Sequence, residues 1–163
     1  MDLATFTAIH TALSLIAMAA GLVVVIGLLR NRTMPWWTAL FLLTAVATSA
    51  TGFGFPFNGF LPSHAVGIVS LIVLAAAILA RYLFRFAGPW RWIYVAGSVV
   101  GLYLDVFVGV VQAFQKIPAL HALAPTQTEP AFAYAQIGTL IVFIVLGIAS
   151  MLTFDRRSAV ADA

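Results

Sequence analysis

The sequence predicts an all-α, polytopic membrane protein: a five-transmembrane-helix bundle with its N-terminus outside and its C-terminus inside. Three observations lead to this prediction. Of the 163 residues, 63% are hydrophobic and 8% are charged, and the mean hydropathy is +1.09. The apolar residues fall into five long runs, and almost all cations lie at one end of those runs. Because soluble domains carry about 25% charged residues, this chain is expected to have the lipid bilayer as its main partner.

The five apolar runs have the length of membrane spans. Each holds about 20–24 residues, and about 20 helical residues cross ~30 Å of hydrocarbon. Helices are expected because backbone amides in lipid must pair within their own segment. The predicted spans cover about residues 6–29, 36–55, 63–84, 92–114 and 131–154. Together they form a single integral membrane domain, residues 1–163.

Charges and prolines next to the apolar runs support the interpretation of each run as a membrane span. The first run follows Asp2 without any positive charge ahead of it, and it is too long for a signal peptide, so it is interpreted as a span. The second, third and fifth runs begin next to Pro35, Pro62 and Pro130. The fourth follows Pro89 closely. Prolines at these edges are typical of helix starts.

The distribution of cations predicts the orientation. With the N-terminus outside, only Lys116 lies on the outer side, and all seven arginines lie on the inner side. The seven are Arg30, Arg32, Arg81, Arg85, Arg91, Arg156 and Arg157. Cytoplasmic loops carry such an excess of Lys and Arg, and the four tryptophans fall at the same interface. We therefore expect a multi-pass protein of the bacterial inner (plasma) membrane.

Composition also excludes several classes of function. The chain has no cysteine, which excludes disulfides, thiol redox chemistry, iron–sulfur clusters and covalently attached c-type haem. No basic patch with interleaved aromatics is present, so no nucleic-acid partner is expected.

Small residues form a stripe along the fourth run. Gly97, Gly101, Asp105 and Gly109 recur every four residues, which places them on one face of a helix. Small residues let transmembrane helices approach closely. The stripe is therefore expected to pack inside the bundle, or to meet a partner membrane subunit or a second copy of the chain through Gly97, Gly101 and Gly109.

Polar side chains gather in the predicted outer half. His10 and His64 lie near the outer starts of the first and third spans, and Gln112 and Gln136 lie at the outer ends of the fourth and fifth. A one-sided cluster of this kind is typical of a pocket that opens to the outside. We expect ligand-binding side chains at His10, His64, Gln112 and Gln136, with Asp105 deeper in the membrane.

Asp105 is the least expected residue of the spans, because no lysine or arginine lies within ten residues of it. A charged carboxylate near the bilayer centre costs at least ~2.5–3.5 kcal/mol on insertion scales. The cost falls if the acid is neutral, if it bonds to polar groups of neighbouring helices, or if it orients a histidine. A purely structural bridge and a role in a binding site or proton path both stay open.

Two cofactors also stay open. His10, His64, His121 and Glu129 would suit a transition metal, with His121 in a short surface helix expected at residues 118–124. His10 and His64 alone could ligate a b-type haem from two helices. The histidines are far apart in sequence, with no HxxxH or HExxH motif. A simpler interpretation, interfacial histidines bonded to loop carbonyls or headgroups, also stays open.

Three short stretches carry a family resemblance: 51–56 (TGFGFP), 62–67 (PSHAVG) and 79–82 (LARY). They resemble small bacterial inner-membrane proteins of unassigned function. In length and helix count the chain is similar to the tryptophan-rich sensory (translocator) family, which binds porphyrins and sterols. The likeness is one of architecture, since the tryptophans here form two interfacial pairs and do not reproduce that family's aromatic motifs.

The sequence thus favours a protein that binds a small ligand or metal ion, and transport of that ligand across the membrane stays open. A redox protein with b-type haem and an accessory or structural subunit are the alternatives, and an enzymatic role is less favoured than binding.

Overall fold

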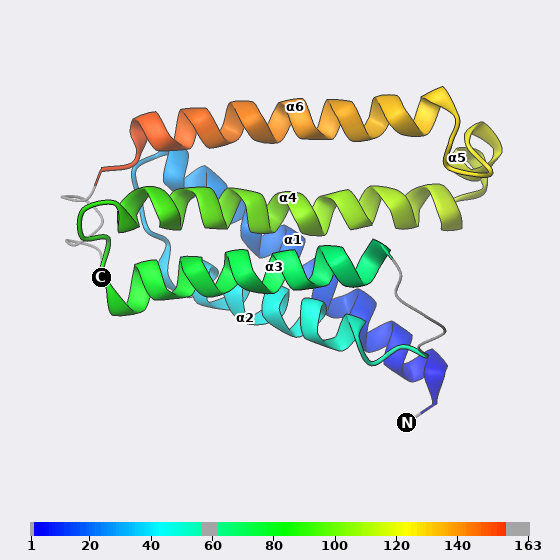
Figure 1. Ribbon diagram of the computed structural model, residues 1–163, viewed down its shortest axis with the longest axis horizontal. Helices are drawn as coiled ribbons and strands as arrows, with labels where there is room; N and C mark the ends of the chain where they lie inside the picture. Colours follow the sequence, from blue (N-terminus) through cyan, green and yellow to red (C-terminus); the bar gives the residue numbers. More distant parts are fainter. Residues whose placement is uncertain (1, 57–61, 156–163) are drawn as a thin grey trace.

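The computed structural model describes residues 2–56 and 62–155, and these are almost entirely helical (Figure 1). The helices in chain order are α1 (Leu3–Leu29), α2 (Pro35–Gly52), α3 (Pro62–Ile78), α4 (Trp90–Lys116), α5 (Pro118–Leu123) and α6 (Pro130–Thr153), and a π-helix, η1 (Leu79–Leu83), continues α3. No strand occurs in residues 2–56 or 62–155. The predicted all-α class is confirmed, and each long helix begins and ends within a few residues of its predicted bounds.

Four of the helices in the described part of the chain are long and apolar enough to cross a membrane. They are α1, α3 with η1, α4 and α6. The chain is therefore a multi-pass membrane protein. α2 is not one of these four helices, because Trp36, Trp37 and several threonines lower its hydropathy.

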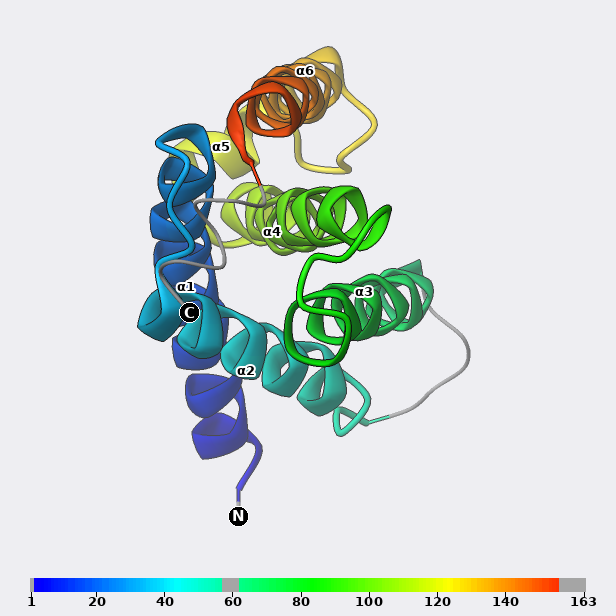
Figure 2. The ribbon, with the colours of Figure 1, turned by 90° about the vertical axis from the view of Figure 1, so that its left-hand side faces the viewer.

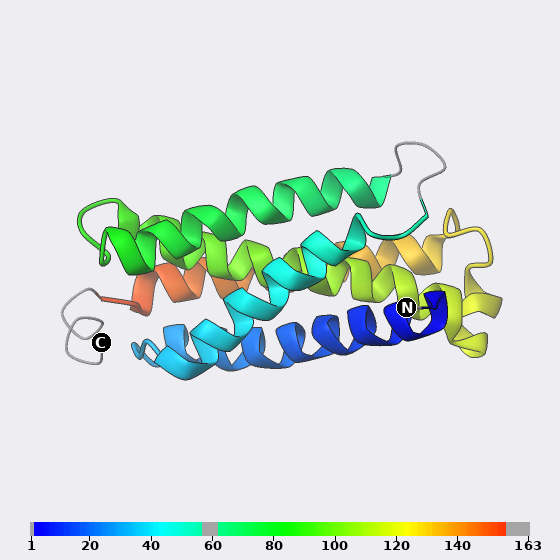
Figure 3. The same ribbon diagram turned by 90° about the horizontal axis from the view of Figure 1, so that it is seen from below.

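The long helices run alternately up and down between two ends of the molecule (Figure 1). α4 lies centrally and packs against α1, α3 and α6, whereas α6 covers α4 from the outside (Figure 2). α2 crosses the bundle obliquely and packs on α1 and α3 (Figure 3). α5 is a short helix at one end, as expected for residues 118–124.

The cations separate between the two ends. Arg30 and Arg32 follow α1, and Arg85 and Arg91 flank the connection from η1 to α4, so all four lie at one end, which we call the arginine end. Lys116 is the last residue of α4 and lies at the opposite end. Arg156 and Arg157, which the charge pattern also assigns to the inner side, lie outside the described residues.

The buried core fills the half of the bundle nearest the arginine end. It includes α1 from Ala17 to Leu28, α2 from Phe41 to Ala45 and α4 from Tyr94 to Leu102. Tyr94 is fully buried, and its hydroxyl lies 3.3 Å from Thr38 Oγ1, which in turn donates to the Thr33 carbonyl. Farther along α4, residues 103–111 are only half-buried. Packing is therefore loose toward the other end.

The glycine stripe of α4 packs inside the chain, which is the first of the two arrangements expected for it. A Cβ at Gly97 would lie 2.9 Å from Ala77 Cβ, and one at Gly101 would lie 2.9 Å from the Leu74 side chain, so both glycines let α3 approach closely. Gly109 lies beside Met18 of α1. Neighbouring helices of the same chain therefore cover the face that a partner subunit would have used.

Replacing Gly97 with leucine is expected to lower the thermal unfolding midpoint in detergent by several degrees. The side chain would collide with Ala77 and with the Val73 carbonyl, 3.2 Å from the new Cβ, and overpacking costs about 1–3 kcal/mol. Gly138→Leu is the matched control, because a Cβ there meets no atom within 4 Å. Equal midpoints for the two variants would contradict close α3–α4 packing at Gly97.

Candidate functional site

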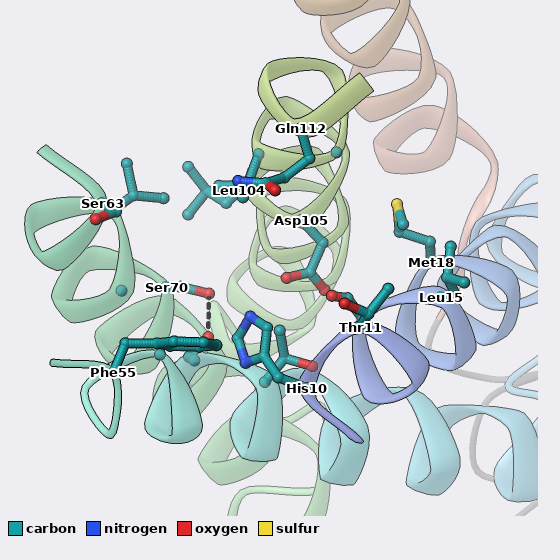
Figure 4. Close-up of a pocket in the computed structure, with 18 of the residues that line it drawn as sticks. His10, Thr11, Leu15, Met18, Phe55, Ser63, Ser70, Leu104, Asp105 and Gln112 are labelled. Carbon is teal, nitrogen blue, oxygen red and sulfur yellow. Dashed lines mark hydrogen bonds between the residues drawn. The ribbon is translucent and has the colours of Figure 1, made fainter. Parts of the chain in front are cut away.

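A pocket of about 550 Å³ lies at the end of the bundle opposite the arginines, between α1, α2, α3 and α4 (Figure 4). We call it the His–Asp pocket. It occupies the region where residues 103–111 of α4 are half-buried. The helices diverge there because the close contacts at Gly21, Gly97 and Gly101 lie nearer the arginine end.

The pocket brings together four of the five side chains predicted to bind a ligand. His10 comes from α1, His64 from α3, and Asp105 and Gln112 from α4. His10 and His64 are far apart in sequence but share this pocket because α2 returns the chain from the arginine end to the same end.

His10 is held in one orientation by a hydrogen bond. Its Nδ1 lies 2.9 Å from Thr51 Oγ1. The Thr51 hydroxyl donates to the carbonyls of Ala47 and Thr48, so it accepts from Nδ1–H of the imidazole. The neutral ring then carries its lone pair on Nε2, and the edge of Phe55 packs against the ring at 5.1 Å between centroids. Nε2 is thus an acceptor or a ligand atom.

His64 is buried near the start of α3, with 8% of its surface exposed. Its ring stacks on Phe53 at 5.6 Å between centroids, and the two planes are inclined by 25°. Phe53 itself fits against Gly67, where a Cβ would lie 3.2 Å from the phenyl ring. The Phe53 ring therefore packs against the imidazole at the wall of the pocket.

Asp105 projects from α4 toward α1, where Thr11 lies (Figure 4). Its Oδ2 is buried and has no hydrogen-bond partner among the described residues. A buried polar atom left without a partner costs about 1–3 kcal/mol. A structural bridge would satisfy this oxygen, so the lack of a partner for Oδ2 among the described residues favours the interpretation in which Asp105 belongs to a site.

Other polar groups of the pocket were not predicted as site residues. Lys116 lies one turn beyond Gln112 on α4, at the mouth of the pocket, and Ser14 lies one turn below His10 on α1. Both could have been found from helical spacing, since Asp105, Gln112 and Lys116 share one face. Ser49 donates to Ser70 at 3.0 Å across α2 and α3, a contact that spacing does not reveal.

Gln136 does not belong to the His–Asp pocket, which corrects the prediction. Its Nε2 donates to the Phe107 carbonyl at 3.2 Å, and its Oε1 is buried without a partner among the described residues. The side chain therefore joins α6 to the face of α4 that is turned away from the pocket.

The four predicted metal ligands are not brought together. In residues 2–56 and 62–155, no group of three His, Asp or Glu side chains is close enough to hold a metal ion. His121 is exposed on α5. The Glu129 carboxylate accepts hydrogen bonds from the backbone amides of Thr126 and Thr128. Burial is the largest single effect and raises the pKa of this carboxyl, but the hydrogen bonds together outweigh it and hold the pKa below its usual value.

Comparison with known protein families, with curated proteins and with solved structures finds no match to this chain. The function must therefore be inferred from the pocket and from the apolar helices themselves.

Proposed function

We propose that the chain is a five-span protein of the bacterial inner membrane that binds a small ligand in an outward-facing pocket. The observation that carries this proposal is the convergence of His10, His64, Asp105 and Gln112 in one pocket of about 550 Å³, at the end away from the arginines. Small-molecule sites are concave and mostly apolar, with a few converging polar groups.

The count of five spans depends on α2. Its 18 residues cover about 27 Å at ~1.5 Å per residue, close to the thickness of the hydrocarbon core. The polar side chains that lower its hydropathy point inward, since Thr44, Thr48 and Ser49 are all buried. Low hydropathy therefore reflects the lining of the bundle, and α2 can still present an apolar surface to lipid.

The lining of the pocket indicates the chemistry of the ligand. Leu15, Met18, Phe55 and Leu104 provide an apolar wall. His10 Nε2 offers an acceptor, and the Asp105 carboxyl offers a buried oxygen that has no partner in the described part of the chain. A ligand with an apolar body and a hydroxyl or an amine would pack against this wall and donate a hydrogen bond to one of these two acceptors. If the protein transports this ligand, transport would use the same site.

A metal site, a haem site and a subunit role each have less support than small-ligand binding. A single metal ion would have only His10, His64 and Asp105 available at the pocket, and these do not form a ligand group. A b-type haem needs both imidazoles to reach one iron, and a Soret band in the purified protein would be its signature. An accessory subunit would need a contact face other than the glycine stripe, which is covered within the chain.

The proposal is tested with three probes that share one ring: benzylamine, benzyl alcohol and toluene. The purified protein is expected to bind the amine and the alcohol more tightly than toluene in NMR titrations. Asp105→Asn is expected to weaken benzylamine binding about tenfold or more, because hydrogen bonds to charged groups contribute about 1.5–3 kcal/mol. Asp155→Asn removes the same charge at an exposed position and is expected to have no effect.

A pocket-filling variant distinguishes binding of the probes in the pocket from their partition into the detergent. Gly109→Phe places a ring beside Met18, inside the pocket, and should abolish saturable binding. Gly138→Phe adds the same ring where no atom lies within 4 Å. If Gly109→Phe and Asp105→Asn bind the probes as the unmodified chain does, the His–Asp pocket is not the site.

A further inference from the structure

A second cavity lies at the arginine end, and the ligand-binding proposal does not use it. It has a volume of about 580 Å³ and lies between the start of α2, η1 and the turn that follows η1. Its lining consists of Pro35, Trp36, Ala39, Arg81, Tyr82, Arg85 and Phe86. We call it the Arg81 cavity. Figure 2 views the bundle from this end.

Arg81 is a buried cation at the wall of this cavity, with 8% of its surface exposed. Its guanidinium carbon lies 5.5–5.7 Å from the ring centroids of Tyr82, Phe86 and Tyr94. Aromatic faces stabilise a cation in part, but they do not accept its N–H groups as oxygen does. The Nη1 atom of Arg81 is buried and has no hydrogen-bond partner among the described residues. Nη1 therefore remains an unused donor on a residue that lines the cavity.

The backbone around Arg81 is irregular. Leu79–Leu83 form a π-helix, and Arg85 and Phe86 both adopt left-handed conformations, with φ of +44° and +60°. Non-glycine residues in this region cost about 1–3 kcal/mol each, and π-helical turns are frequent at functional sites. The Phe86 amide closes the turn by donating to the Ala80 carbonyl at 3.0 Å. This geometry places the Phe86 ring against Arg81.

The charged residues that line the cavity are all positive. Arg81 and Arg85 are its only charged lining residues among those described, and no carboxylate lines it. The N-terminus of α2 also borders it, at Pro35 and Trp36, and has no side-chain cap. Unpaired amides at a helix start carry partial positive charge and favour anions.

The position of the cavity indicates which anion it would take. Trp36, 88% exposed, stands at its rim, and exposed tryptophans are typical of the level of lipid headgroups. Basic pockets between transmembrane helices bind anionic headgroups. We propose that the Arg81 cavity binds the phosphate group of an anionic phospholipid, with Arg81 as the buried donor, Arg85 at the rim, and Pro35, Trp36 and Ala39 against the glycerol backbone.

The test uses short-chain lipids added to the purified protein in detergent. Dihexanoyl phosphatidylglycerol is expected to raise the thermal unfolding midpoint in a saturable way, and dihexanoyl phosphatidylcholine to raise it less. Arg81→Gln should weaken the apparent affinity for phosphatidylglycerol about tenfold or more, since it removes charge-assisted hydrogen bonds. Arg85→Gln, at an exposed residue, should weaken it to a smaller extent without affecting folding.

Arg32→Gln is the matched control, because Arg32 is exposed at the same end and does not line the cavity. It is expected to bind phosphatidylglycerol as the unmodified chain does. If Arg85→Gln and Arg32→Gln respond alike, the effect is general attraction between charges and the proposal fails. Saturable protection by inorganic phosphate, with no further effect of phosphatidylglycerol, would overturn the assignment to a lipid.

Discussion

A cysteine introduced at Thr126 is expected to react with a membrane-impermeant maleimide in intact cells, whereas cysteines at Pro89 and Arg32 react only after the membrane is opened. Thr126 lies between α5 and α6, and the other two lie in turns at the arginine end. The natural sequence has no cysteine, so each variant carries a single thiol. Arginine-rich loops stay on the cytoplasmic side, and all three positions are exposed.

The three positions answer two questions: the orientation of the bundle, and whether α2 spans the bilayer. Thr126 and Pro89 lie at opposite ends of α4 and therefore report the orientation of the bundle. Because α3 with η1 is long and apolar enough to span the membrane, Arg32 and Pro89 lie on the same side only if α2 spans it as well. Reaction at Arg32 in intact cells, with Pro89 protected, would show that α2 does not span the bilayer. Reaction at Pro89 with Thr126 protected would invert the proposed orientation.

A cysteine at Ser14 is expected to react with a small, positively charged methanethiosulfonate at least about tenfold faster than a cysteine at Val145. Only the thiolate reacts, and it forms where water reaches the sulfur. Ser14 lines the His–Asp pocket. Val145 is 59% exposed in the middle of α6, on a surface that faces hydrocarbon. The measurement is the labelling rate in purified membranes, followed by the mass of the protein.

Filling the pocket provides the control for this rate. Gly109→Phe, combined with the cysteine at Ser14, should slow the reaction to the level seen at Val145, because the new ring occupies the space beside Met18. Combined with the cysteine at Thr126, outside the pocket, the same substitution should change nothing. An unchanged rate at Ser14 would mean that the reagent reaches it by a route other than the His–Asp pocket.

The helices were predictable because hydropathy and proline placement are local signals. The structure begins α2 at Pro35 and α6 at Pro130, next to the positions expected from the sequence. Whether α2 crosses the membrane was harder to predict. Its threonines reduce the hydropathy. Their helical spacing predicts one face turned into the bundle, and the structure buries Thr44 and Thr48 there.

The candidate site was predictable in part. His10, His64, Asp105 and Gln112 can be grouped by depth, and depth is a consequence of helix length and direction. The error at Gln136 has a different origin. Depth does not determine which way a side chain points around the helix axis, and Gln136 meets the Phe107 carbonyl instead of the pocket.

The Arg81 cavity could not have been predicted by the same reasoning. The sequence of η1, LARYL, reads as ordinary helix, and no glycine or proline marks the left-handed residues Arg85 and Phe86. The distribution of cations along the sequence only places Arg81 among the charges that predict the orientation of the protein in the membrane. Its burial among aromatic rings depends on contacts with Tyr94, in a different helix.

α6 has few anchors for a helix of 24 residues: Phe143 and Ser150 are its buried side chains. The main core joins α1, α2, α3 and α4, and most of its members precede residue 103. During synthesis the ribosome completes those segments well before α6, so the interior can close while the last helix is still being made. We therefore expect α6 to dock last, when Phe143 and Phe154 complete the core.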